Sequence, residues 1–273
     1  MDKNVTSGLR QSIDHQVTTH PKILENVYAK GDFRRVGLNT DMLARSLLQR
    51  GMMSARLNGD FQSARADFAL AAGWTQEFDR ALEAVRQSGQ KAVAPRWFAC
   101  LDIHSFEIPL FACVLAHQWP RALALARITH DPLVLELEDE TKTLMTRLLV
   151  AFVLDDHAAF AERKAVYDKS KKSAWWKYFL HYVDMYDSVI NRDQARYGEL
   201  ATTADSLYRA RARDRKFGDL RPEYGGRADN ERMLDFIALA IAIVAVKRGM
   251  QPGKASDIVP IELISEAAIP AVY

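Results

Sequence analysis

The sequence predicts an all-α fold, on three observations. Apolar residues recur at helical spacing through most of the chain, no convincing run of alternating β-branched residues interrupts them, and glycine and proline are sparse, at 13 and 9 of 273 residues. Short polar stretches that contain Asp, Asn or Gln separate the apolar segments near residues 60, 118, 156 and 192. We therefore expect helices joined by tight turns at these four places.

The spacing of the turns favours helical hairpins. The last two intervals are 38 and 36 residues by subtraction, within the range of about 34–47 residues that is typical of helical-hairpin repeats. Residues 50–72 come nearest to a tetratricopeptide repeat, although their spacing differs from the consensus by one residue and no other hairpin matches it. We expect an irregular, tetratricopeptide-like array of hairpins in a single domain, residues 1–273, and a multi-helix bundle is the alternative.

The individual helices follow from caps and apolar spacing. Thr40 or Asp41 can cap the first clear helix, and Pro120 suits the first turn of a later one. Asp155 and Asp156 fit a corner between two helices, where an aspartate caps the second. The expected helical stretches are residues 40–59, 61–74, 75–88, 108–128, 142–170 and 175–214.

An uninterrupted apolar run from Phe236 to Val246 raises the question of a membrane. Its eleven residues are too few to span a bilayer, which requires about 20 apolar residues at 1.5 Å each. A helix that is apolar all round belongs instead in a packed core. We predict a buried helix within residues 228–248, starting at Asn230, with two basic residues in its last turn and Gly249 as its stop.

Bulk composition restricts the function classes. The net charge of +2 and the pI of about 8.5 are too balanced to indicate nucleic-acid binding, and the N-terminal residues lack the apolar core of a signal peptide, which favours the cytoplasm. Cys100 and Cys113 have apolar neighbours and are expected to be buried, with no disulfide. The sequence contains no phosphate-binding loop, nucleophile elbow or zinc-protease motif, so we expect neither catalysis nor a cofactor.

One polar constellation keeps an enzymatic alternative open. His181, Asp184 and Asp187 are spaced three residues apart, so two of them can meet on a helix face and share a proton or a metal. A polar stripe on an amphipathic helix is the favoured interpretation, because no second cluster has recognisable ligand spacing. The alternative is a helical hydrolase that uses His181 and Asp184.

Two surfaces are candidates for binding a partner. Four carboxylates occur within residues 136–140, either as the solvated first turn of a helix or as a negative patch that meets a basic partner. Two adjacent tryptophans cannot both face the same side of one helix, so one of them is exposed or another element covers it. The candidate partner-binding residues are Glu136, Glu138, Asp139, Glu140, Trp175 and Trp176.

The C-terminal third resembles the immunity protein 49 family of bacterial polymorphic-toxin systems. The resemblance rests on Tyr224, Gly225, Gly226, Asn230, Asp235, Phe236, Ala238 to Ala240, Gly249 and Pro260. It implies a non-catalytic cytoplasmic protein that binds and neutralises a cognate toxin, often one that a secretion apparatus delivers between competing bacteria. A helical-repeat scaffold or adaptor for another protein is the alternative.

The same segment carries structural expectations. Gly225 and Gly226 suit a turn with unusual backbone angles. Asp229 or Asn230 can cap the buried helix. Asp235 should find a hydrogen-bond donor, because an unpaired buried carboxylate is costly.

Overall fold

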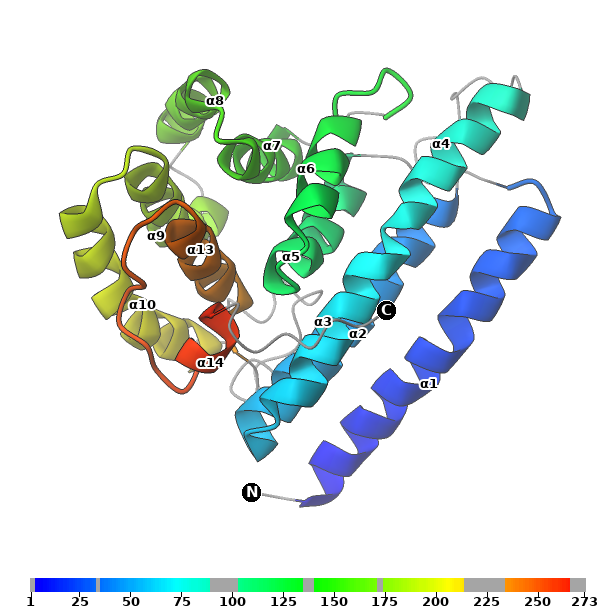
Figure 1. Cartoon of the computed structure of the whole chain (residues 1–273), viewed down its shortest axis with the longest axis horizontal. Coiled ribbons are helices and arrows are strands. Elements are labelled where there is room, and N and C mark those ends of the chain that lie inside the picture. The colour runs from blue at the N-terminus through cyan, green and yellow to red at the C-terminus, as the bar shows by residue number, and fades with distance from the viewer. Residues whose placement is uncertain are drawn as a thin grey trace. The chain divides into compact units, whose positions relative to one another are not determined.

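The computed structural model describes residues 3–32, 35–88, 103–134, 140–170, 174–213 and 234–265. Every regular element in these ranges is a helix, which confirms the all-α prediction (Figure 1). The chain divides into two compact units: a first unit of residues 1–51 and 66–146, and a second unit of residues 52–65 and 147–273. The expectation of one domain, and of an array in preference to a bundle, stays a prediction.

The first unit has a core of aromatic and aliphatic side chains. Its helices are α1 (Lys3–Ala29), most of α2 (Val36–Asn58) and α3 (Phe61–Trp74), α4 (Gln76–Ser88), the short η2 (Ile103–Phe106), α5 (Glu107–Leu115) and α6 (Trp119–Ile128). The rings of Phe78 and Phe106 lie 4.3 Å apart between centroids, and both side chains are fully buried. Helices α5 and α6 form a packed hairpin, with Pro120 in the first turn of α6 as predicted.

Helix α1 was not predicted, because its apolar stripe is narrow. Ile13, Leu24 and Val27 are buried, whereas most of the other described side chains in α1 are exposed or half-buried. Polar contacts also join α1 to α2. The hydroxyl of Ser46 donates to Oε1 of Gln16 at 2.8 Å.

Arg50 connects α1, α2 and α3. It pairs with Asp14 at 3.3 Å, and its guanidinium donates to both carboxylate oxygens of Asp67.

The start of α2 differs from the expectation of a cap at Thr40 or Asp41. The helix begins at Val36, so both residues lie inside it, and Asp41 pairs with Arg45 one turn later at 3.1 Å.

The second unit surrounds the apolar helix. It contains the C-terminal end of α2 and the first residues of α3. Its other elements are most of α7 (Glu140–Leu154), α8 (His157–Ser170), α9 (Ala174–Ile190), α10 (Gln194–Arg213), α13 (Phe236–Lys247) and α14 (Ile261–Ile264). Helices α10 and α13 both pack on α9, and α14 packs on α13 (Figure 1). Residues 237–245 of α13 are all buried, which confirms the core interpretation. No helix within the described ranges is both long enough and apolar enough to span a bilayer.

The buried helix is shorter than expected at its N-terminal end. It begins at Phe236, because Leu234 and Asp235 have non-helical backbone and Asp235 acts as the N-cap. Residues 228–233 lie outside the described part of the chain. At the other end Gly249 has φ of +78°, as expected of a helix stop.

The predicted turns share one geometry. After each helix a single residue adopts left-handed backbone: Gly59, His117, Asp155 and Arg192, with φ between 56° and 64°. The amide of the following residue then bonds to a carbonyl of the preceding helix. This carbonyl lies five residues back for Gln118, Asp156 and Asp193, which bond to Cys113, Ala151 and Ser188, and six residues back for Asp60, which bonds to Ser54. Except at His117, the following residue is an aspartate whose carboxylate caps the next helix.

Candidate functional site

The structure places few of the predicted partner-binding side chains. Glu140 is the first residue of α7, and Trp175 and Trp176 lie in the first turn of α9, but only their backbone is described. Glu136, Glu138, Asp139, Tyr224, Gly225, Gly226 and Asn230 lie outside the described residues. Among the predicted site residues, Asp235 is the one whose side-chain surroundings can be described.

Asp235 is a buried and fully bonded helix cap. Asp235 directly precedes the first residue of α13, and it is 2% exposed. Oδ1 accepts a hydrogen bond from the amide of Ala238 at 3.0 Å, and Oδ2 accepts one from the hydroxyl of Tyr182 at 3.0 Å. The expectation that Asp235 finds a donor is confirmed. Asp235 itself, not Asp229 or Asn230, caps α13. That its role is structural stays a prediction.

A second tyrosine lies close to this carboxylate. Tyr208 of α10 directs its hydroxyl to the carbonyl of Leu234 at 3.4 Å. Burial raises the pKa of Tyr208 strongly, the negative charge of Asp235 raises it further, and Arg56 opposes both effects. The phenol therefore stays neutral and can only stabilise the cap region as a donor.

Ion pairs attach the C-terminal segment to the same region. Arg56, near the end of α2, pairs with Asp257 at 2.8 Å. Arg209 of α10 pairs with Asp205 at 2.8 Å and also with Asp257. Because Asp257 bonds to both arginines, it holds the segment after α13 against two helices of the second unit.

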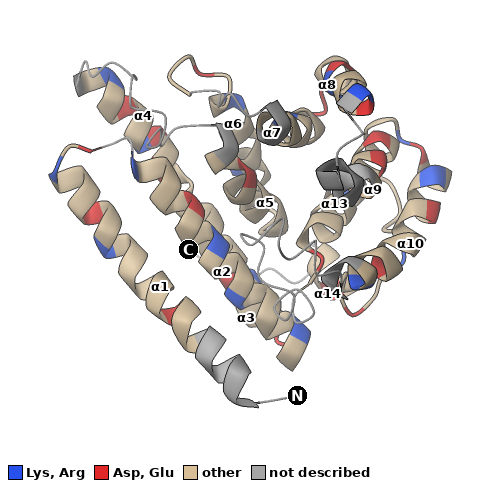
Figure 2. Ribbon diagram, turned by 180° about the vertical axis from the view of Figure 1, so that it is seen from behind, with Lys and Arg blue, Asp and Glu red and all other residues tan. Residues whose placement is uncertain are grey.

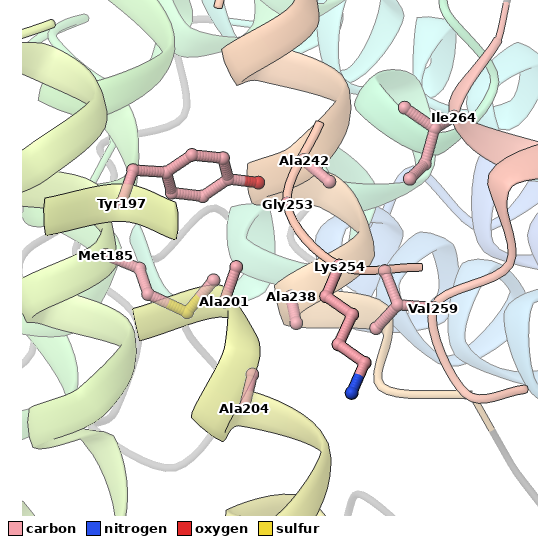
Figure 3. Close-up of a pocket in the computed structure, with 10 residues that line it drawn as sticks. All are labelled: Met185, Tyr197, Ala201, Ala204, Ala238, Ala242, Gly253, Lys254, Val259 and Ile264. Carbon is pink, nitrogen blue, oxygen red and sulfur yellow. The ribbon is translucent and has the colours of Figure 1, made fainter. Parts of the chain in front are cut away.

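A small apolar cavity lies under this segment (Figure 3). Alanines of α10 and α13 line it, together with Met185, Tyr197, Gly253, Val259 and Ile264, and Lys254 is the one charged residue among the described residues at its edge. It has room for roughly one water molecule, whereas small-molecule sites have volumes of about 300–1,000 Å³. The cavity therefore fits a packing defect better than a substrate pocket.

The most distinctive charged cluster joins two hairpin turns to the end of α13. We call it the turn triad: Asp155 between α7 and α8, Arg192 between α9 and α10, and Arg248 after α13. Arg192 donates to Oδ2 of Asp155 at 2.7 Å and to Oδ1 at 3.3 Å. Arg248 contacts Oδ1 at 3.0 Å and also donates to the carbonyl of Phe152. Charges of both signs are interspersed along the helices, including the region of the α9–α10 turn (Figure 2).

The two arginines of the triad differ in burial. Arg192 and Asp155 are 41% and 39% exposed, whereas Arg248 is 8% exposed and its guanidinium lies 4.9 Å from the centroid of the Phe152 ring. Burial lowers the pKa of Arg248 to about 10, although the charge of Asp155 opposes this effect. Arg248 is nonetheless charged at neutral pH.

Asp155 is stabilised as an anion. Partial burial would raise its pKa, but the hydrogen bond from Arg192 and the charges of both arginines outweigh this effect. The net pKa shift is downward. The carboxylate is therefore ionised at neutral pH.

Two residues of the triad have an unfavourable backbone conformation. Asp155 and Arg192 both have left-handed backbone, with φ of 58° and 57°, which costs a residue with a Cβ roughly 1–2 kcal/mol. Glycine adopts this conformation freely and occupies the same turn position at Gly59. The side chains at positions 155 and 192 therefore contribute something that glycine cannot.

Sequence analysis identified these turns but not the triad. Asp155 and Arg192 were assigned to turns and Arg248 to a helix end, and nothing in the spacing showed that the three meet. The available signal was the absence of glycine at left-handed turn positions, a feature that His117 shares without joining the triad.

His181, Asp184 and Asp187 contact different residues. His181 is 8% exposed, and its ring lies edge-on to Tyr182. Arg196 of α10 pairs with Asp187 at 2.9 Å and with Asp184 at 3.4 Å. These contacts favour the polar-stripe interpretation, while the hydrolase alternative stays a prediction.

Comparisons with known proteins add no assignment. No protein-family model, no curated protein and no solved structure matches this chain. Across the residues that the structure describes, no group of three His, Cys, Asp or Glu side chains is arranged to hold a metal ion. The resemblance in the C-terminal third therefore stays a prediction.

Proposed function

We propose that this chain is a cytoplasmic immunity protein that neutralises a cognate antibacterial toxin by forming a stoichiometric complex with it. The observation that carries the proposal is the turn triad, in which the partly exposed charges of Asp155 and Arg192 lie on left-handed backbone at the turns of two helical hairpins. Such strain is concentrated at functional sites, and complementary charges at interfaces provide specificity and speed association. The resemblance in residues 224–260 supports the same function.

The acidic run at residues 136–140 is the proposed contact for a basic toxin surface. It contains Glu136, Glu138, Asp139 and Glu140, while the whole chain has a net charge of only +2. Toxins that attack nucleic acids need cationic active sites, and a row of carboxylates can occlude such a site by mimicking phosphates. A nuclease is therefore the toxin class that this contact fits best.

The test is the affinity of the protein for the product of the neighbouring gene, measured across a salt series. Glu138→Lys, Asp139→Lys and Glu140→Lys are combined in one variant, which should bind more weakly and with a smaller salt dependence. The matched control reverses Glu25, Glu83 and Glu162, three exposed carboxylates elsewhere in the chain. Because both variants gain the same charge, only a local contact separates them.

The outcomes distinguish the alternatives. Equal affinities and equal salt slopes for wild type and the acidic-run variant would remove this run from the interface and leave it as a helix end. If the neighbouring product does not bind at all, the immunity function is wrong and the scaffold or adaptor alternative takes its place. Trp175→Ala and Trp176→Ala test the second candidate contact, since a buried tryptophan anchor contributes about 2 kcal/mol or more.

A further inference from the structure

We infer that α1 is a pH-sensitive element of the first unit, docked on α2 and α4 while His20 is neutral and released when His20 is protonated. The inference goes beyond the proposed function, because it concerns only residues of the first unit. It does not depend on whether a toxin binds.

His20 occupies a core position of α1. The buried side of this helix has apolar residues at alternating spacings of four and three, which places one row of side chains against the rest of the unit. The row is Ile13, Val17, His20, Leu24 and Val27. Val17 is half-buried, and the other four are at least 93% buried. His20 is thus the ionisable member of an otherwise apolar row.

The surroundings of His20 suit the neutral ring. Its Nδ1 is buried and has no hydrogen-bond partner among the described residues. A neutral imidazole has one N–H group, whereas an imidazolium has two and a full charge. Protonation therefore adds a charge and a donor inside the apolar row. In agreement with this, burial lowers the pKa of His20 below its ordinary 6.5.

The charged groups on the helices around α1 are matched with each other. Within the first unit, each described carboxylate of α2, α3 and α4, and Asp14 of α1, lies beside an arginine. The pairs are Asp41 with Arg45, Asp14 and Asp67 with Arg50, Glu77 with Arg80, Asp79 with Arg121, and Glu83 with Arg86. On α1 itself, His15, Lys22 and Glu25 are exposed. An imidazolium at His20 therefore gains little from these charges.

The remaining attachment of α1 is weak. The helix runs antiparallel to α2 (Figure 1), and the Asp14 side chain that pairs with Arg50 is 49% exposed, so this pair adds little stability. Further along, the guanidinium of Arg80 lies 3.9 Å from the centroid of the Tyr28 ring, and Arg80 is 63% exposed. Pro21 lies inside α1, where it removes one backbone hydrogen bond next to His20.

The direction of the pH effect follows from proton binding. In the released helix His20 has its ordinary pKa of 6.5, and in the docked helix its pKa is lower. Above pH 6.5 both forms are neutral, so docking does not depend on this residue's titration. Below pH 6.5 the released form binds more protons, which favours release by up to about tenfold per pH unit.

Hydrogen exchange of the full chain, read by mass spectrometry at pH 7.5 and pH 5.5, measures the release. Exchange times are scaled for the intrinsic pH dependence of amide exchange. Peptides from residues 11–29 of α1 should lose protection by up to about tenfold at pH 5.5. Peptides from α5, in the same unit, should keep theirs.

Three variants assign the effect to His20. His20→Gln keeps a polar side chain that does not titrate, so α1 should be equally protected at both pH values. His20→Leu completes the apolar row and should also abolish the pH effect, which covers the case that the glutamine variant docks poorly. His15→Gln removes an exposed histidine of the same helix and should lose protection in acid as the wild type does.

Three results would overturn the inference. They are equal protection of α1 at both pH values in the wild type, the same acid-dependent loss in His20→Leu as in the wild type, and an equal loss in α5, which would mean that the whole unit opens. None of these measurements contains a toxin. The immunity function is decided separately, by the affinity for the neighbouring gene product.

Discussion

Tyr182 of α9 donates a hydrogen bond of 3.0 Å to Asp235, the residue that caps α13, across 53 positions of sequence. Both residues are at least 95% buried. The same carboxylate accepts the amide of Ala238, so one side chain both starts the central helix of the second unit and attaches it to α9.

Asp235→Ala should destabilise the fold by about 2–4 kcal/mol. About 1 kcal/mol is the loss of the cap, and the remainder is the cost of leaving the buried Tyr182 hydroxyl and Ala238 amide without an acceptor. Urea denaturation measures the change. Tyr182→Phe and the double variant complete a cycle, in which the two effects should be less than additive. Unchanged stability together with lost partner binding would make Asp235 an interface residue and the structural assignment wrong.

Gly253→Ala should destabilise the protein by about 1–3 kcal/mol. A Cβ at this position would lie 2.2 Å from the Cβ of Ala201, closer than two carbons can approach. Replacing Ala201 with glycine in the same chain should recover most of the loss. Thermal melts of the single and double variants provide the comparison.

Gly198→Ala is the control, in α10, the helix that carries Ala201. Nothing lies within 4 Å of a Cβ built there, and the position is inside a helix. The substitution should raise stability by about 0.5–1 kcal/mol, because alanine loses less backbone freedom than glycine on folding. Destabilisation at both glycines would contradict the packing explanation.

Asp155→Asn should reveal the charge of the triad through its pH dependence. The pKa of Asp155 in the folded protein lies below the ordinary 3.8, so the carboxylate stabilises the fold above about pH 4. This contribution is lost as the pH falls below 3.8 and through the folded pKa. Because Asp155 is 39% exposed, the difference should not exceed about 1 kcal/mol.

The measurement is the free energy of unfolding of both proteins from pH 7 to pH 2. Asparagine tolerates the left-handed backbone, so the comparison isolates the charge. In an Arg192→Gly background the same substitution should have a smaller pH-dependent effect. An advantage of the wild type that persists unchanged at pH 2 would show that the contact is not electrostatic.

Cys113 should resist thiol reagents in the folded protein. Burial raises the pKa of its thiol to about 11, against smaller opposing effects of Thr75 and Arg121. At pH 8 roughly one thiol in a thousand is then ionised, and the side chain is fully buried. In a Cys100→Ser variant, which removes the other cysteine, labelling should proceed only at the rate of unfolding. Rapid stoichiometric labelling under native conditions would contradict this expectation.

The sequence by itself determined most of the helices in the described segments, and the four turns between them. Apolar periodicity placed α3 to α10, and polar residues placed the turns near 60, 118, 156 and 192. These features are local, because a helix needs only its own backbone bonds and one apolar face, and a turn needs only a few residues of suitable chemistry.

Only the tertiary structure decided what those elements bring together. Helix α1 escaped prediction because its polar contacts to α2, such as Gln16 with Ser46, join residues that carry no apolar signal. Arg192 and Asp155 are 37 positions apart, and Arg248 reaches the end of α7 across 96 positions. Side-chain chemistry permits many such pairs, and the packing of α9, α10 and α13 selects the ones that form. The triad is thus a product of packing, since no local spacing specifies which charged ends meet.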